Sequence, residues 1–396
     1  MQQESILQFR RDTPGASERI HFNNAGCSLP VAATIETLTS YIEKEARTGG
    51  YETARDYTAA LDQVYSSVAK LINASPDEIA FTESATRAWD TALYSIPFKK
   101  GDIILTGGLE YVSNNIGYAH LVNRFGVEIQ SIPEESNGEI SITALQNRID
   151  SKVKLIGLTH IATNNGIVQP AAAVGAIAKA AGIPYLLDAC QSVGHVPVDV
   201  QEIGCDFLSA TGRKYLRGPR GTGFLYVRKA MLEKTDPPFL DMHAAQWIGN
   251  NEYTIRPDAK RFESWEYSAA LRLAMGTAID YAIQVNPVNY YPYIESLANY
   301  LRERLQQIPG IALHHFFGKG CGIITFTTPG FDCIAIRDAL FKRNINVSAT
   351  GPLEGYWQDA KPPVPSLVRA SVHYYNTTAE IDLFIQELEK VLAALR

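Results

Sequence analysis

Short apolar runs bounded by turn residues alternate with helical segments over the first two thirds of this chain. Residues 102–105, 153–158 and 185–187 have the length and composition of buried strands. Between the last two runs, residues 171–181 have helical composition and are followed by Gly182, which favours helix termination. Strands that alternate with helices predict parallel βαβ units, so this order favours an α/β core with a mostly parallel sheet.

The pattern changes after about residue 285. A long helical segment leads into new strands near residues 323–327 and 370–373, and an amphipathic helix closes the chain. Thr377 and Glu380 fit a capping box that would begin this last helix. We therefore expect an N-terminal segment at 1–20, a large α/β domain at 21–285 and a smaller α+β domain at 286–396.

Composition and charge narrow the class of protein. The 396 residues carry a formal charge of −6, which leaves no broad basic field for nucleic acid or anionic lipid. No apolar run has the length of a transmembrane helix, and the N-terminus has no signal-peptide pattern. The five cysteines form an odd set without a CxxC pair. We therefore expect a cytoplasmic protein with no metal site, no membrane segment and no nucleic-acid partner.

One carboxylate stands where ligands bind in α/β sheets. Asp188 directly follows the strand at 185–187, and the carboxyl ends of parallel strands border the ligand crevice of such sheets. Taken alone, Asp188 is also a favoured helix N-cap residue. The position therefore predicts either a helix cap or a group that faces a ligand.

Two further segments could bind an anion and a carbonyl compound. Glycines, hydroxyls and cations gather at 209–223, and Lys214 lies among them, where its amine could become a nucleophile for a Schiff base. At 81–88 a short strand meets a helix start rich in small and hydroxyl residues, which suits a phosphate. A basic surface loop and an ordinary N-cap are the corresponding structural interpretations.

In this order, the three features resemble the pyridoxal-phosphate (PLP) enzymes of the class V aminotransferase and cysteine desulfurase group. The resemblance runs from residues 22–26 to 369–371 and is most specific at 188–194, at the Lys214 turn and at 261–263. It implies the aspartate aminotransferase fold, with a large α/β domain and a smaller C-terminal domain. It also implies an amino-acid substrate and a homodimer.

The resemblance also assigns roles to individual residues. Lys214 would hold the cofactor covalently and act as the catalytic residue, and Asp188 would pair with the pyridinium nitrogen. Further cofactor contacts would come from Ala85, Thr86, Tyr111, Thr163 or Asn164, Gln191, Thr211 and Arg213. The substrate would be bound by Arg369, Asn24 and Arg220, with Arg217 and Trp265 as further candidates.

Two positions depart from the usual pattern of the group. Relatives usually carry histidine where this chain has Arg213, and often carry histidine where it has Tyr111. A guanidinium can still bind phosphate, and an aromatic ring can still stack on a pyridine. Because the phenol does not exchange protons near neutral pH as imidazole does, proton transfer at Cα would fall mainly to Lys214.

The reaction type depends on a missing thiol. Cysteine desulfurases need a mobile cysteine in the loop before the substrate-binding arginine, and residues 346–365 contain none. We therefore favour a C–S lyase that performs β-elimination on a cysteine derivative, with a class V aminotransferase or an amino-acid epimerase as alternatives. A cysteine desulfurase that uses Cys27, and a non-catalytic PLP-fold binding protein, remain further alternatives.

Overall fold

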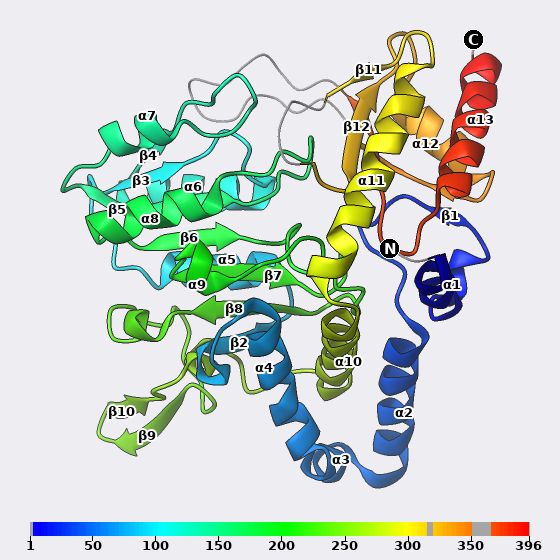
Figure 1. Ribbon diagram of the computed structural model, residues 1–396. Helices are drawn as coiled ribbons and strands as arrows, with labels where there is room; N and C mark the ends of the chain where they lie inside the picture. The colour runs from blue at the N-terminus through cyan, green and yellow to red at the C-terminus, as the bar shows by residue number, and fades with distance from the viewer. Residues whose placement is uncertain (1–2, 315–319, 351–365, 396) are drawn as a thin grey trace.

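A seven-stranded sheet forms the centre of the molecule (Figure 1). The computed structural model describes residues 3–314, 320–350 and 366–395. The strand order is β2-β8-β7-β6-β5-β3-β4, and all strands run in one direction except β8, which runs opposite to the others. The strands are β2 (Ile79–Thr82), β3 (Ile103–Thr106), β4 (Glu128–Ser131), β5 (Val153–Thr159), β6 (Tyr185–Asp188), β7 (Phe207–Thr211) and β8 (Gly223–Val227). The predicted α/β class with a mostly parallel sheet is confirmed.

Helices cover both faces of this sheet because successive side chains of a strand point to opposite sides. In β6, Tyr185 and Leu187 enter one apolar core, whereas Leu186 enters another. The first core is completed by α4 (Thr58–Ile72), α7 (Ile142–Asn147), α8 (Ala171–Ala181), α9 (Val200–Ile203) and α10 (Ala269–Val285). The second is completed by α5 (Ala85–Tyr94) and α6 (Val112–Phe125). Burial on both faces explains the nearly continuous apolar runs in the sequence.

Two helix boundaries agree with their sequence signals. Helix α8 ends at Gly182, which adopts the left-handed conformation with a φ of 66° and donates its N–H to the Ala178 carbonyl. Helix α13 (Thr378–Ala394) begins at the capping box that Thr377 and Glu380 form. Local turn and cap chemistry therefore determined where these helices begin and end.

A third core lies around a smaller antiparallel sheet of order β11-β12-β15-β14. Its strands are β11 (Ala312–Leu313), β12 (Ile323–Thr327), β14 (Ser348–Thr350) and β15 (Leu367–Ser371), and its helices are α11 (Pro287–Gln306), α12 (Cys333–Phe341) and α13. N-terminal residues Ile20 and Phe22 are buried in this core, and β1 (Ile20–His21) pairs with β13 (Ile345–Asn346). Both ends of the chain thus contribute to one packing unit, and the proposed division at residue 285 remains a prediction.

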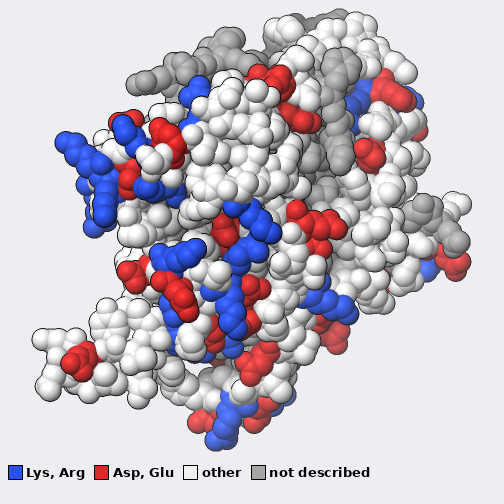
Figure 2. Space-filling view, turned by 60° about the vertical axis from the view of Figure 1, so that its left-hand side comes forward, with Lys and Arg blue, Asp and Glu red and all other residues white. Residues whose placement is uncertain are grey.

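The remaining elements lie at the periphery. They are α1 (Gln3–Arg11), α2 (Ala32–Thr48), α3 (Gly50–Asp56) and the hairpin of β9 (Ala245–Gly249) and β10 (Glu252–Ile255), which projects at the lower left of Figure 1. Basic and acidic side chains are interspersed over the face that Figure 2 shows. Among the described helices, none is long and apolar enough to cross a membrane. The described residues also contain no cluster of three or more metal-ligating side chains.

His195 links the large-sheet unit to the smaller sheet, because it bonds Gly322 just before β12 and Gln191 after β6. Its Nε2 accepts a hydrogen bond from the Gly322 amide at 2.8 Å, so its Nδ1 carries the proton and donates to the Gln191 carbonyl at 2.9 Å. The imidazole ring stacks on Tyr215 with a centroid distance of 3.7 Å. Burial lowers the pKa of His195 to about 3, so the ring is neutral in the folded protein.

The neutral state of His195 predicts a loss of stability in acid. The pKa is lower in the folded than in the unfolded chain, so stability falls as the pH drops from about 6.5 toward 3. When the pH is lowered from 7 to 4.5, we expect the free energy of unfolding of the natural chain to fall by about 2–3 kcal/mol more than that of His195→Gln. Denaturant titration at both pH values measures this difference. His120→Gln, which replaces an exposed histidine, is the control. If the stability of His195→Gln depended on pH as that of the natural chain does, the prediction would be refuted.

Candidate active site

Polar side chains converge at the carboxyl edge of the large sheet. Asp188 ends β6, and the strand register places it beside Thr159 of β5 and Ser209 of β7. Its Oδ1 accepts from the Cys190 amide at 2.9 Å, and its Oδ2 accepts from Asn114 Nδ2 at 3.0 Å. Burial raises the pKa of Asp188, although these donors and the charge of Lys214 oppose that effect. A carboxylate with this setting can hold a cationic N–H of a ligand.

Lys214 is held in a tight turn that follows β7. The turn is closed by hydrogen bonds from the Gly218 amide to the Gly212 carbonyl at 2.8 Å and from the Arg217 amide to the Lys214 carbonyl at 2.9 Å. The Lys214 ammonium lies 5.8 Å from the centroid of the Tyr111 ring. The fold therefore brings Lys214, Tyr111 and Asp188 to one place, as a cofactor site requires.

Arg217 has a role that sequence reasoning missed. The sequence grouped it with the substrate pocket, but its side chain is only 1% exposed and is enclosed by protein. Its guanidinium donates to the Leu29 carbonyl at 2.9 Å and to the Tyr374 hydroxyl at 3.0 Å, and it also contacts Thr13. Arg217 therefore ties the Lys214 turn to both ends of the chain. No local pattern signals this, because its partners are distant in sequence.

Thr163 connects two residues that the sequence placed around the substrate and cofactor. Arg369 Nη1 donates to Thr163 Oγ1 at 2.7 Å, and Gln191 Nε2 donates to the same oxygen at 2.9 Å. Gln191 also binds the Ala25 carbonyl at 3.0 Å. Of the two alternatives, Thr163 is the one whose side chain links these groups, and Asn164 follows it in the same turn. Within the described part of the chain, the buried Gln191 Oε1 and Arg369 Nε make no hydrogen bond, so both could bind a ligand.

The start of α5 forms the predicted phosphate cradle. Ser84 caps the helix by accepting from the Arg87 amide at 3.2 Å, and the first-turn N–H groups of Ala85 and Thr86 have no acceptor within the helix. Gly223, the first residue of β8, lies against this turn. A Cβ there would come 2.9 Å from the Ala85 nitrogen and 2.6 Å from the Ser84 carbonyl carbon, so only glycine fits.

Three predicted site residues have protein partners. The Arg213 guanidinium donates to the Gly26 carbonyl, and the buried Asn24 amide donates to the Ser371 carbonyl at 2.7 Å. Thr211 Oγ1 donates to the Thr222 carbonyl at 3.2 Å. Arg220 is exposed, and with Arg213 it acts electrostatically on Cys27. The ligand contacts of these residues remain predictions.

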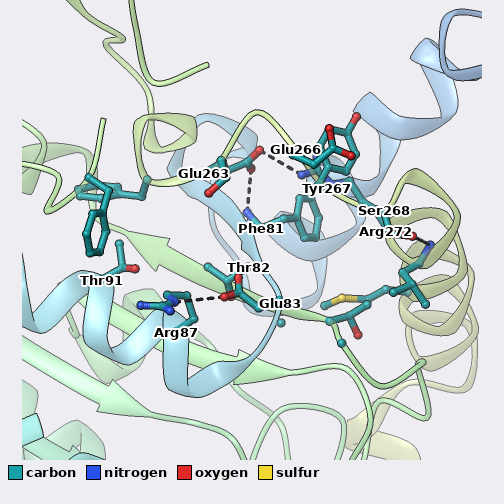
Figure 3. Close-up of a pocket in the computed structure, with 18 of the residues that line it drawn as sticks. Phe81, Thr82, Glu83, Arg87, Thr91, Glu263, Glu266, Tyr267, Ser268 and Arg272 are labelled. Atoms are coloured by element: carbon teal, nitrogen blue, oxygen red, sulfur yellow. Dashed lines mark hydrogen bonds and ion pairs between the residues drawn. The ribbon is translucent and has the colours of Figure 1, made fainter. Parts of the chain in front are cut away.

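A pocket of about 500 Å³ lies outside this cluster (Figure 3). Phe81, Glu83, Glu263 and Arg272 line it, whereas Lys214, Asp188 and Arg369 do not. Glu263 accepts from the Phe81 amide at 2.8 Å and pairs with Arg272 at 3.2 Å, which fastens the segment before α10 to β2. The pocket shares Gly223 with the wall of the phosphate cradle but holds none of the predicted reactive groups.

The residues present fit pyridoxal phosphate. Asp188 can face the ring nitrogen, Lys214 can bind the aldehyde carbon, and the first turn of α5 can bind the phosphate. Within the described part of the chain, the buried Gln191 Oε1 and Arg369 Nε have no hydrogen-bond partner, so both remain available to a ligand.

Comparison with known proteins identifies the family of the chain. The family model for class-V aminotransferases matches residues 20–384. A cysteine desulfurase of Yersinia pestis is 31% identical over 98% of both chains. A probable cysteine desulfurase of Synechocystis sp. is 30% identical over 94% of this chain and 91% of its own.

Solved structures share the fold. The apo cysteine desulfurase of Thermococcus onnurineus superposes with a TM-score of 0.89 at 23% identity, covering 100% of this chain and 99% of its own. The cystine C–S lyase C-DES, in complex with cysteine persulfide, gives a TM-score of 0.84 at 22% identity, covering 95% and 98%. The chain therefore belongs to the aminotransferase class-V family, and the predictions of its fold and of a PLP-dependent enzyme are confirmed.

The cradle at α5 predicts the effect of one methyl group. Gly223→Ala would push against Ser84 and Ala85 and displace the first turn of α5. We expect the affinity for PLP to fall about tenfold or more. Titration of the apoprotein with PLP, followed by absorbance, measures this loss. Gly50→Ala, where the new Cβ meets only a distant Glu45 side chain, is the control, and equal affinities in the two variants would contradict the assignment.

Proposed function

We propose that this protein is a C–S lyase that performs PLP-dependent β-elimination on a cysteine derivative. The observation that carries the proposal is the joint presence of Lys214, Asp188 and Arg369 around Tyr111, while no cysteine occurs between residues 334 and 365. Most of the loop in which desulfurases need a thiol, 351–365, lies outside the described residues. A cystine C–S lyase and cysteine desulfurases share this fold, so the fold is compatible with the proposed reaction and with the desulfurase alternative.

The bound cofactor would supply an electron-accepting ring next to the substrate Cα. The Asp188 carboxylate would keep a proton on the ring nitrogen, because Asn114 and the Cys190 amide donate to it and favour its charged form. The first turn of α5 would hold the phosphate through its free N–H groups. These residues fix the ring without taking part in bond cleavage.

Lys214 and Arg369 would act on the substrate. The Arg369 guanidinium, oriented by Thr163, would bind the α-carboxylate through paired hydrogen bonds. The Lys214 amine would remove the Cα proton. The Cα–H electron pair then forms a Cα=Cβ bond as the Cβ–S bond breaks and the sulfur leaves with its pair. Hydrolysis of the product would give pyruvate and ammonia.

Other reactions of the family begin with the same proton transfer. A class V aminotransferase would need a second half-reaction with a keto acid, and an epimerase would need a proton donor on the opposite face. A desulfurase would need a nucleophilic thiol. Burial raises the pKa of Cys190, Cys205 and Cys321, which disfavours their thiolates.

A product assay tests the proposed reaction. With cysteine, cystine and cysteine sulfoxides as substrates, we expect pyruvate and a sulfur product in equal amounts without an added keto acid. Lys214→Ala should lose both turnover and the absorbance band of covalently bound PLP. A keto acid that retains the substrate carbon skeleton would indicate transamination. A natural chain without such a band would indicate a non-catalytic binding protein.

Cys27 provides the test of the desulfurase alternative. This half-buried cysteine lies close enough to Arg213 and Arg220 for their charges to oppose the effect of burial, although its pKa is still raised. We expect Cys27→Ala, and then a variant with all five cysteines replaced, to keep at least half of the natural turnover. Loss of turnover in Cys27→Ala with intact PLP absorbance would favour a persulfide mechanism.

We also propose a homodimer. Apolar side chains remain exposed on the projecting hairpin and near the pocket of Figure 3, and Trp247 is 78% exposed. The others are Phe239, Met242, Ile248, Tyr253, Trp265 and Tyr267. Exposed apolar side chains of this kind suit contact with a second copy of the chain. Light scattering should give twice the 43.6 kDa chain mass, and Trp247→Glu should weaken the association. An active monomer would refute the dimer.

A further inference from the structure

Glu110 is a buried carboxylate close to Asp188 that the proposed mechanism does not use. Glu110 precedes Tyr111 in the chain, and its side chain is 2% exposed. Oε1 accepts from the Thr159 amide at 2.7 Å, and Oε2 accepts from Thr159 Oγ1 at 2.7 Å. Among the described residues, no lysine, arginine or histidine forms an ion pair with it. A buried acid without a cation is costly, which calls for a functional reason.

Asn114 joins the two carboxylates. Its Nδ2 donates to Glu110 Oε2 at 3.3 Å and to Asp188 Oδ2 at 3.0 Å. An amide has two N–H groups on one end and only a carbonyl oxygen on the other. Because the Glu110 and Asp188 oxygens are the acceptors in these contacts, the two side chains together require the nitrogen end of Asn114 to face them both.

We propose that Glu110 is a positioning residue that fixes the Asn114 amide as a donor to Asp188, and so keeps the Asp188 carboxylate ionised opposite the cofactor ring nitrogen. The inference rests on the proposed PLP-dependent function. A glutamine at position 110 could donate to the Asn114 carbonyl and turn that amide around. Asp188 would then face an oxygen in place of an N–H, which favours its protonated form.

The surroundings of Glu110 show which charges matter. Thr159 approaches from β5, Asn114 and Tyr118 from α6, and Asp188 and Tyr185 from β6. Burial and the charge of Asp188 raise the pKa of Glu110 while hydrogen bonds from Thr159 and Asn114 oppose them, and the net pKa is about 7. Because the charge of Asp188 acts on Glu110, the two carboxylates form one electrostatic unit.

The ring nitrogen of bound ¹⁵N-labelled PLP offers a readout separate from activity. Its NMR chemical shift reports whether the nitrogen carries a proton, and a pH titration gives the midpoint of its deprotonation. We expect Glu110→Gln to lower this midpoint by about one pH unit, a tenfold change typical of a lost charge-assisted hydrogen bond. Tyr118→Phe, which removes a nearby hydroxyl that bonds only Thr106 among the described side chains, should leave the midpoint unchanged.

A double-mutant cycle tests whether Glu110 acts through Asn114. Asn114→Ala should lower the midpoint as Glu110→Gln does, and the double variant should add nothing further. Additive shifts, or a natural midpoint in Glu110→Gln, would overturn the inference. If Glu110→Gln does not fold, an unchanged midpoint in Asn114→Ala would overturn it equally. Failure of the natural chain to bind PLP would instead refute the proposed function.

Discussion

The order of the parallel strands β3, β5, β6 and β7 determines the site. Parallel strands end at one edge of a sheet, so the residues that follow them are brought within hydrogen-bond distance. Asp188 pairs in register with Thr159 and Ser209, and Thr159 binds Glu110, which lies beyond the end of β3. The site is therefore built by strand pairing, and its polar groups are buried because helices cover both faces of the sheet.

Local patterns in the sequence were sufficient to predict the main features of the scaffold. Gly182 at the end of α8 and the Thr377–Glu380 capping box act over only a few residues, so they are readable without tertiary information. The position of Asp188 after an apolar run predicted that it borders the ligand crevice. The family resemblance then related Asp188 to Lys214, which spacing alone does not do.

Contacts between distant segments could not be predicted in this way. Arg217 binds Leu29 and Tyr374, and no periodicity relates these positions. Glu110 and Asn114 are four residues apart in sequence, but their connection to Asp188 depends on how α6 packs against the sheet. A buried polar residue gives no sequence signal of its partners, because the partner is selected by packing.

The N-terminal segment links cofactor residues to the rest of the chain. The Gly26 carbonyl accepts a hydrogen bond from the Arg213 guanidinium, and the Ala25 carbonyl accepts one from Gln191. A guanidinium that already donates to a backbone carbonyl has fewer N–H groups left for a nearby anion. Binding of the phosphate would therefore depend more on the N–H groups at the start of α5. Because the same segment is tied to Ser371 through Asn24, movement of the smaller sheet would be transmitted to Gln191 and Arg213.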